Sequence, residues 1–315
     1  MSAISAAEQL GAEPPPANAT GRSFERAIAD IRDGMREREL WSHLGWQDIK
    51  QRYRRSVLGP FWITISQGVL ALGLGILYSL LFKLHLPVFL PFIATGFIIW
   101  GFIAGCLTEG METFITNEGL IKHLPAPLTV YALRTVWRQT LMFAHNLIVY
   151  VVIVLIFIPT LSGRYALTSN GTCEANPHAI CHPGLGWYTL TAIPAFVLLA
   201  VNAGWITLFL GVISTRFRDF PQLIGSIIQL LFYLTPIVWP IDQLYSGGNR
   251  ENVSWALHVV YFNPFYHFVQ IIRAPLIGQA VSPWSWVVVG GITVVGWAVA
   301  LFVMRNYRSR VSYWV

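Results

Sequence analysis

The chain has 315 residues, of which 55% are hydrophobic and 11% charged, whereas about 25% are charged in an average soluble protein. A soluble fold cannot cover that much apolar surface, so the composition excludes an ordinary soluble domain and indicates a lipid environment. The net charge of +6 does not indicate a nucleic-acid partner, because the basic residues lie beside apolar segments and form no binding stripe.

Two segments precede the first apolar run. Residues 1–21 are small and proline-containing, and we expect a disordered cytoplasmic tail. Residues 22–58 predict one amphipathic helix, lying in the membrane interface and not across it. Whether this helix is a plain membrane anchor or docks a protein stays open at this point. Its first apolar stripe recurs at helical spacing and consists of Phe24, Ile28, Ile31 and Met35.

Residues 59–315 predict an all-α transmembrane domain, because six uncharged apolar runs recur along them. A run of 22 residues forms a helix of about 33 Å, enough to cross the hydrocarbon core. Six crossings would leave both ends of the chain on the same side. The runs cover residues 61–82, 88–107, 141–158, 188–213, 220–241 and 286–304.

The distribution of basic residues predicts the orientation. With the N-terminus inside, 17 of the 21 Lys and Arg residues fall in inner segments and 4 in outer segments. Positive residues are retained on the cytoplasmic side, so both termini are expected there. The arginines Arg52, Arg54 and Arg55, directly before the first run, would lie at the level of the cytoplasmic headgroups.

Between the second and third runs, an amphipathic helix is expected on the cytoplasmic side. Pro125 and Pro127 would end it. Such a helix could receive movement from a soluble partner, and a plain connector packed on the bundle is the alternative. The residues expected on its apolar side are Met111, Phe114, Ile115, Ile121 and Leu124.

The segment 242–285, between the last two runs, is apolar but broken by Asn263-Pro264 and by Pro275. Each half is shorter than the ~20 residues that a crossing needs. The break predicts an outward-facing re-entrant or interfacial helix pair. Irregular backbone at this depth must be buried in protein or line a cavity, so the pair is a candidate gate.

The residues also argue against several chemistries. No GxxxxGK[ST] sequence occurs, which argues against ATP binding through a P-loop in this chain. No Asp or Glu lies inside the six runs, where ion-coupled carriers usually place one. His145 and Asn146 in the third run could bind a polar cargo, or could join neighbouring helices.

Cys173 and Cys181 lie in the outer loop and are candidates for a disulfide, because that compartment is oxidising. His178 and His182 lie beside them and suggest a metal site only weakly, so no metal ligands are assigned. Cys106, in the second run, is interpreted as a small core residue.

Aromatic residues make up 14% of the chain. Trp187, Trp284 and Trp286 are expected at the membrane interfaces. Deeper aromatic rings could stack on the sugar rings of a cargo, or could simply pack the bundle. The candidates for lining a channel are Trp62, Trp100, Tyr233, Trp239, Phe265 and Tyr266.

Four stretches, in this order, resemble ABC-2 type permeases that export polysaccharides such as O-antigen, capsule or teichoic acid. The stretch "RYRRSVLGPFW" is similar to the start of that family's first span, and "NEGLIKHLPAPLTVYALRTVWRQ" to its coupling region. "TRFRDFPQLIGSIIQLLFYLTPIVWP" and "YFNPFYHFVQIIRAPLIG" resemble its fourth-to-fifth-span junction and its re-entrant pair. The chain departs from many members in reading "LPAPL" where they have Phe-Pro-Arg.

The resemblance implies a half-transporter of the inner membrane: a homodimer forming the pore, with two separate ATPase subunits that bind the ATP and Mg. No cofactor is then expected in this chain. Arg52, Arg54 and Arg55 would bind the headgroup of a lipid-linked polysaccharide at the inner rim. The residues implied to couple to the ATPase are Asn117, Glu118, Leu120, Ile121 and Lys122.

Two alternatives remain. One is an ABC-2 exporter of small lipids or drugs, which differs only in its cargo. The other is a membrane glycosyl- or acyltransferase, which would need acidic or histidine side chains gathered near the interface. The candidates for that chemistry are scattered along the sequence: Asp219, Asp242, Glu251, His258 and His267.

Overall fold

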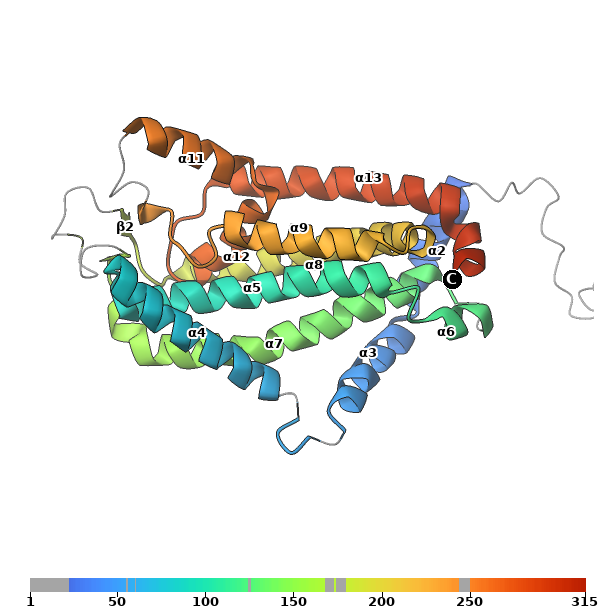
Figure 1. Ribbon diagram of the computed structural model, residues 1–315, viewed down its shortest axis with the longest axis horizontal. Helices are drawn as coiled ribbons and strands as arrows, with labels where there is room; N and C mark the ends of the chain where they lie inside the picture. The colour runs from blue at the N-terminus through green and yellow to red at the C-terminus, as the bar shows by residue number, and fades with distance from the viewer. Residues whose placement is uncertain are drawn as a thin grey trace, which may run out of the picture.

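The computed structural model describes residues 23–54, 56–59, 61–123, 126–167, 173, 180–243 and 250–315, with only the backbone described at 250–253. The described part is an elongated helical bundle (Figure 1). Before the outer loop it contains α2 (Phe24–Arg36), α3 (Arg38–Arg52), α4 (Phe61–Phe82), α5 (Leu86–Glu112), α6 (Glu118–His123) and α7 (Leu128–Leu161). After α7 come β1 (Tyr165–Ala166), β2 (Cys181–His182), η2 (Trp187–Thr191), α8 (Ala192–Arg216), α9 (Phe220–Leu234), α11 (Arg250–Phe262), α12 (Pro264–Leu276) and α13 (Pro283–Trp314).

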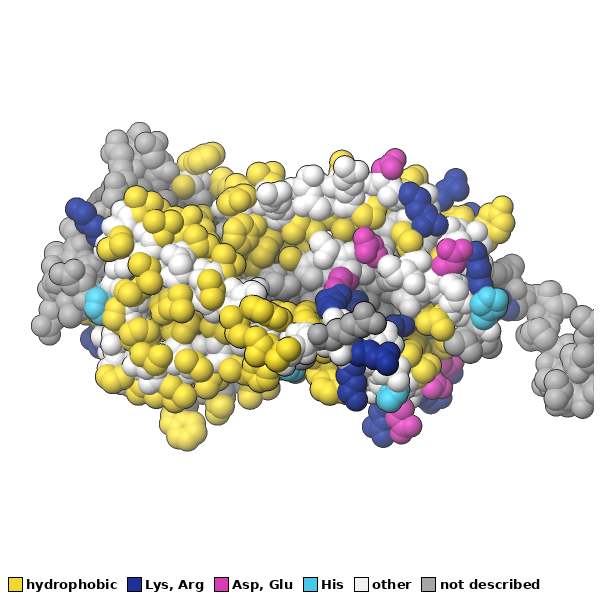
Figure 2. Space-filling model, turned by 60° about the horizontal axis from the view of Figure 1, so that its bottom comes forward, with side chains coloured by type: hydrophobic (Ala, Val, Ile, Leu, Met, Phe, Trp, Pro, Cys, Tyr) yellow, Lys and Arg dark blue, Asp and Glu magenta, His cyan; other side chains and the backbone are white. Residues whose placement is uncertain are grey.

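Five of the described helical stretches are long and apolar enough to cross a membrane: α4, α5, α7, η2 with α8, and α13. α5 lies at the centre, buried along most of its length against α4, α7 and α8. α4, α7 and α13 carry large apolar side chains that are exposed, as lipid-facing helices do. On the face shown in Figure 2, hydrophobic side chains cover most of the length of the bundle, and the charged side chains gather toward one end.

The fifth predicted run differs from the prediction. Its helix, α9, covers 15 residues and ends at Leu234, which is about 22 Å of helix and too short for the hydrocarbon core. The chain nevertheless returns to the end of the bundle that holds β2, where Asp242 lies 2.8 Å from His182. The chain therefore reaches that end of the bundle through non-helical backbone after α9, and α9 is not among the five described stretches long enough to cross.

That non-helical backbone is buried and its polar groups are bonded within the protein. The guanidinium of Arg273 donates to the carbonyl of Pro236 at 2.6 Å, and the amide of Asn263 donates to the Thr235 hydroxyl at 2.9 Å. A Cβ on Gly96 would come within 2.9 Å of the Ile237 carbonyl oxygen, so only glycine lets the segment lie this close to α5. Burial in protein makes irregular backbone tolerable at this depth.

The predicted single helix over 22–58 is wrong in one respect: two helices, α2 and α3, meet at Glu37. α2 buries Ala27, Asp30 and Gly34 against the bundle. The predicted apolar stripe faces away from it, with Phe24, Ile28 and Met35 all exposed. The small-residue face of α2 is thus the packing face, and the apolar stripe is left for lipid or another partner.

The predicted helix between the second and third runs is also corrected. Met111 lies at the end of α5 and Phe114 in the turn after it, and both are fully buried. Only six residues, Glu118–His123, form the separate helix α6, and none of them is buried. Leu124 and Pro125 lie outside the described residues.

α11 and α12 meet at Asn263-Pro264, where the sequence predicted a break, and the Asn263 side chain caps α12 by accepting from the Phe265 N–H. The far end of α12 is held firmly. The three successive carbonyl groups of residues 276–278 accept hydrogen bonds from the Tyr150 hydroxyl, the Tyr165 hydroxyl and the Gly184 N–H. These bonds satisfy acceptors that a helix end leaves free.

The two described chain ends lie at the same end of the bundle, opposite β2 and α11 (Figure 1). An ion pair between Asp30 of α2 and Arg308 of α13, at 2.6 Å, joins them there. The predicted tail at 1–21 lies outside the described residues.

Candidate functional site

A cluster of charged side chains joins α3, α5 and α7 at the end of the bundle that holds α6. Arg134 donates to both carboxylate oxygens of Asp48, at 2.8 and 2.5 Å, and to the Asn117 amide oxygen at 2.8 Å. Arg138 donates to Asp48 at 2.7 Å and to Glu109 at 3.0 and 2.7 Å. We call these five residues the ionic cluster.

The local sequence explains how one helix supplies both central cations. Arg134 and Arg138 are four residues apart on α7, so they project from the same helical face. α7 has 34 residues, about 51 Å of helix, so its first turns extend beyond the hydrocarbon core. Its charged part therefore lies where water and neighbouring carboxylates can stabilise it.

The cluster is mostly shielded from solvent. The side chains of Asp48 and Arg134 are each 15% exposed. Burial by itself raises the pKa of Asp48, but hydrogen bonds and charges from Arg134 and Arg138 outweigh it, and the pKa lies below its ordinary 3.8. Asp48 is thus held as a carboxylate that ties α3 to α7.

A polar cavity of about 260 Å³ lies beside the cluster. Its wall includes Glu112, Thr113, Thr116 and Arg52 in addition to members of the cluster. Arg52, the last residue of α3, donates to Glu109 at 3.3 Å. This polar space lies directly beside the ion pairs of the cluster.

The residues implied to couple to an ATPase fall into two groups. Asn117 is part of the ionic cluster, whereas Glu118–His123 forms the exposed helix α6. Lys122 pairs with Glu118 at 2.5 Å, which lowers the pKa of Glu118, and also donates to the carbonyl of Val315 at 3.1 Å. Ile121 packs against a buried cluster that includes the end of α13, while Leu120 is exposed.

Of the three arginines of the predicted inner rim, the structure describes two, Arg52 and Arg54. Arg52 belongs to the wall of the polar cavity and is paired with Glu109. Arg54 is exposed, and Arg55 lies outside the described residues.

The channel-lining candidates do not line one surface within a single chain. Trp62 and Tyr233 are exposed, whereas Trp100 and Tyr266 are buried. Trp239 donates its indole N–H to the carbonyl of Tyr233 at 3.2 Å. The sixth candidate, Phe265, lies 5.7 Å from the Trp100 ring and lines an apolar cavity of about 180 Å³.

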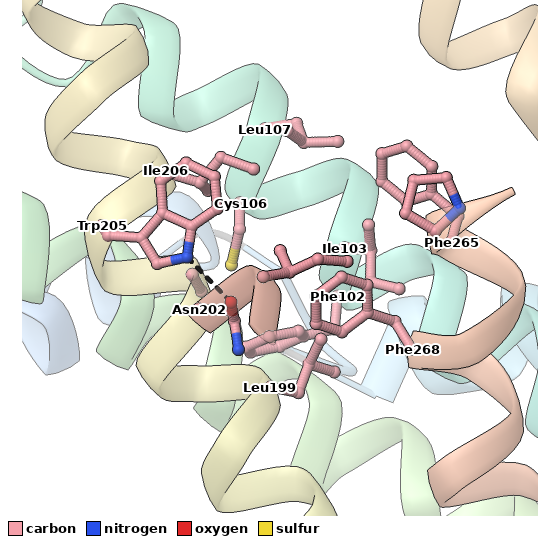
Figure 3. A pocket seen from close by; sticks show the side chains of 13 residues that line it. Phe102, Ile103, Cys106, Leu107, Leu199, Asn202, Trp205, Ile206, Phe265 and Phe268 are labelled. Atoms are coloured by element: carbon pink, nitrogen blue, oxygen red, sulfur yellow. Dashed lines mark hydrogen bonds between the residues drawn. The ribbon is translucent and has the colours of Figure 1, made fainter. Parts of the chain in front are cut away.

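That apolar cavity lies between α5, α8 and α12 (Figure 3). Cys106, Leu199 and Phe268 are in its wall, and Asn202 brings a polar group that accepts from the Trp205 indole at 2.8 Å. The cavity is smaller than the 300 Å³ or more typical of ligand sites. Its small volume and almost wholly apolar wall fit a packing defect better than a binding site.

Several other residues that the sequence singled out form bonds within the protein. Cys173 and Cys181 form a disulfide with Cα atoms 5.6 Å apart. His182 pairs with Asp242, and His178 lies outside the described residues. His145 bonds to the carbonyl of Leu141 at 2.9 Å in its own helix. Within the described part of the chain, no three His, Cys, Asp or Glu residues gather as metal ligands.

The enzyme candidates make different contacts in the structure. His267 is buried and bonds to Ser285 at 3.0 Å and to the carbonyl of Tyr261 at 2.9 Å. Asp219 lies at the start of α9, while Asp242 lies at the opposite end of the bundle beside β2. The side chain of Glu251 is outside the described residues.

The family model for ABC-2 type transporters matches residues 39–277, which is most of the chain and includes the ionic cluster. The chain belongs to the ABC-2 type transporter family. It is also 25% identical over 218 residues to an O-antigen export system permease protein RfbA of Klebsiella pneumoniae, covering 69% of this chain and 72% of that protein. A Myxococcus xanthus protein of the same name is 21% identical over 221 residues, covering 70% and 76%.

Within this ABC-2 transporter chain, sequence reasoning missed four members of the ionic cluster: Asp48, Glu109, Arg134 and Arg138. The two arginines were counted only as markers of the inner side. A usable sign was present, because Arg134 and Arg138 lie one helical turn apart just before an apolar run. Their carboxylate partners are 29 to 90 residues away in sequence, which no local pattern reveals.

Proposed function

We propose that this chain is the membrane-spanning permease subunit of an ABC exporter that moves a lipid-linked, O-antigen-like polysaccharide from the cytoplasm across the inner membrane. Membership of the ABC-2 family supports transport. The names of the relatives in Klebsiella pneumoniae and Myxococcus xanthus support the cargo class. Five long apolar helices support a multi-pass position in the membrane.

The ionic cluster is the observation that carries the mechanism. α3 and α6 are polar helices at the end of the bundle that also holds both described chain ends (Figure 1). Asp48 connects α3 to α7, and Asn117, the residue directly before α6, accepts a hydrogen bond from Arg134 of α7. An ATPase subunit that moves against α3 or α6 would pull on Arg134, and through Arg138 and Glu109 on α5.

In this proposal the nucleotide chemistry belongs to a separate subunit. ATP and Mg bind to two ATPase subunits, and this chain carries no cofactor. Two copies of the chain form the translocation channel, with both termini in the cytoplasm. The exposed apolar side chains on α4 and α9, such as Trp62 and Tyr233, are available to a second copy or to lipid.

A long polysaccharide exceeds the cavities of about 180 to 480 Å³ found among the described residues, so alternating access with an occluded cargo is unsuitable. Stepwise movement through a continuous channel fits better, because aromatic faces accept sugar rings in any register. The helix pair α11 and α12 would close the outer end of that channel. α12 is anchored by bonds from residues 150, 165 and 184. Movement of the pair would therefore be carried by α11, which the bond between His267 and the Tyr261 carbonyl ties to α12.

The deciding experiment is depletion of the chain in its host, followed by localisation of lipid-linked polysaccharide. Accumulation on the cytoplasmic side, with loss of surface glycan, is the expected result. A plasmid copy should restore export, and a copy with Asp48→Asn should not. Normal surface glycan in depleted cells would overturn the polysaccharide cargo and favour an ABC-2 exporter of small lipids or drugs.

A further inference from the structure

A third cavity, larger than the two described above, lies between the last turns of α8 and α13, at the end of the bundle that carries α6. Its volume is about 480 Å³. α13 contributes one helical face to it, with Val303, Tyr307, Arg310 and Trp314 at spacings of 4, 3 and 4 residues. α8 contributes Val212 and Arg216, also four residues apart.

The wall of this cavity changes from apolar to cationic along its length. Val303 lies at the end of the apolar part of α13, and Arg310 follows seven residues later, about 10 Å further along the helix. On α8 the wall changes from apolar to cationic in the same direction, from Val212 to Arg216 four residues later. Both helices thus cross from the hydrocarbon level to the headgroup level within the one cavity.

The charge of the cavity is of one sign. Its two ionisable groups with a full charge are Arg216 and Arg310, and no Asp or Glu lines it. Among the residues that the structure describes, neither arginine has a carboxylate within ion-pair distance. Both are exposed, so they can reach a ligand without first breaking a buried pair.

The C-terminal ends of helices carry negative partial charge, and α8 and α13 both end here, which would oppose an anion. The structure offsets it with other cations. Arg218 donates to the carbonyl of Trp314 at 3.2 Å, and Lys122 donates to that of Val315 at 3.1 Å. Arg216 stacks over the Trp314 ring, 5.6 Å from its centroid, and keeps its full charge beside the cavity.

We propose that this cavity binds an acidic amphiphile, with its chains against Val212 and Val303 and its phosphate between Arg216 and Arg310. An aromatic side chain at the headgroup level, Trp314 or Tyr307, would fix the depth of the ligand. The phosphate could belong to a resident phospholipid or to the lipid carrier of a cargo. The site does not depend on which cargo the chain exports.

The test uses the full chain in a neutral detergent, titrated with phosphatidylglycerol or phosphatidylcholine while the thermal unfolding midpoint is recorded. A ligand that binds the folded state raises the midpoint. We expect a saturable rise with phosphatidylglycerol that phosphatidylcholine does not match. In the Arg216→Gln/Arg310→Gln variant, binding of phosphatidylglycerol should weaken about 30-fold, because each basic residue contributes about 1 kcal/mol to an acidic lipid.

Two control variants keep the test decisive. Arg216→Lys/Arg310→Lys retains the charges and should retain most of the binding. Arg32→Gln/Arg36→Gln removes two cations from α2 and should bind phosphatidylglycerol as the wild type does. If the glutamine variant at the cavity binds as tightly as wild type, or no more weakly than the α2 variant, the proposal is overturned.

The source of the phosphate is decided by competition. Farnesyl pyrophosphate is added to chain saturated with phosphatidylglycerol. Displacement that depends on Arg216 and Arg310 identifies the site as one for the carrier headgroup. Lack of displacement, with phosphatidylglycerol still bound through the arginines, identifies a resident phospholipid. If phosphatidylglycerol binds through the two arginines but depleted cells show normal surface glycan, the proposed polysaccharide cargo is overturned. The proposed lipid site would remain supported in that case.

Discussion

The carboxylate of Asp48, on α3, receives two hydrogen bonds from the guanidinium of Arg134, on α7, at 2.8 and 2.5 Å. This two-bond geometry fixes the direction between the helices as well as their distance. α3 is a polar helix that a soluble partner can reach, and α7 runs through the bundle. The Asp48–Arg134 pair therefore links an accessible surface to the membrane domain.

We expect Asp48→Asn to uncouple export and to lower the free energy of unfolding by about 3 kcal/mol, because it leaves two shielded guanidinium groups without their common carboxylate. A double-mutant cycle with Arg134→Gln, measured by denaturant unfolding in detergent, isolates the pair. The exposed pair Arg32–Asp33 provides the control. Its removal should cost less than about 1 kcal/mol. Equal costs for the two pairs would contradict a structural role for the cluster.

The stability of the fold should depend on pH through the same carboxylate. The pKa of Asp48 lies below its ordinary 3.8 in the folded chain, since Arg134 and Arg138 outweigh the opposing effect of burial. A lowered pKa stabilises the fold above the ordinary value, and that stability is lost as the pH falls through the folded value. Unfolding midpoints taken from pH 7 down to about pH 3 should therefore fall less in Asp48→Asn than in wild type.

The long elements of this fold could be predicted from the sequence because long uncharged runs have few stable alternatives in lipid. α9 could not, since its run continues to residue 241 while the helix ends at Leu234. The apolar composition is unchanged across that point. What ends the helix is Pro236 together with the bond from Arg273, which comes from a segment 37 residues later.

The ionic cluster and the packing face of α2 could not be predicted from the sequence either, because both are set by contacts between residues far apart in the chain. The sequence predicted that α2 lies in the membrane interface, but it did not indicate which residues pack on the bundle. Gly34 is one of them, because a Cβ there would lie 2.6 Å from Thr129. In a membrane protein an apolar stripe is not evidence of a protein core. Small residues mark the packed face instead, since lipid already satisfies the large apolar ones.

The arginines before the first span give a third prediction. Substituting Arg52, Arg54 and Arg55 together by alanine should weaken export and leave the chain folded. Arg52 is half exposed and its bond to Glu109 is 3.3 Å long, so that pair contributes less than about 1 kcal/mol. Surface glycan and the amount of folded chain in the membrane are measured together. Normal export by the triple variant would reduce these arginines to topology markers.

A fourth prediction concerns Asp30, which is 3% exposed and holds three helices together. Its carboxylate accepts from the N–H groups of Leu128 and Thr129 at 3.2 and 3.0 Å, and from the Thr129 hydroxyl at 2.8 Å. It thereby caps α7 from a different helix, since Pro127 in the cap position makes no side-chain bond to it. Arg308 of α13 adds a fourth bond at 2.6 Å.

Asp30→Asn removes the charge from a buried site and leaves Arg308 without its carboxylate, so we expect a loss of about 3 kcal/mol in unfolding free energy. Thr129→Val removes one of the four bonds and should cost about 1 kcal/mol. Hydrogen exchange at the first turn of α7 should speed up in both variants, more in Asp30→Asn. Asp33→Asn changes an exposed carboxylate three residues away on the same helix. If it destabilises the chain as much as Asp30→Asn does, the capping role is refuted.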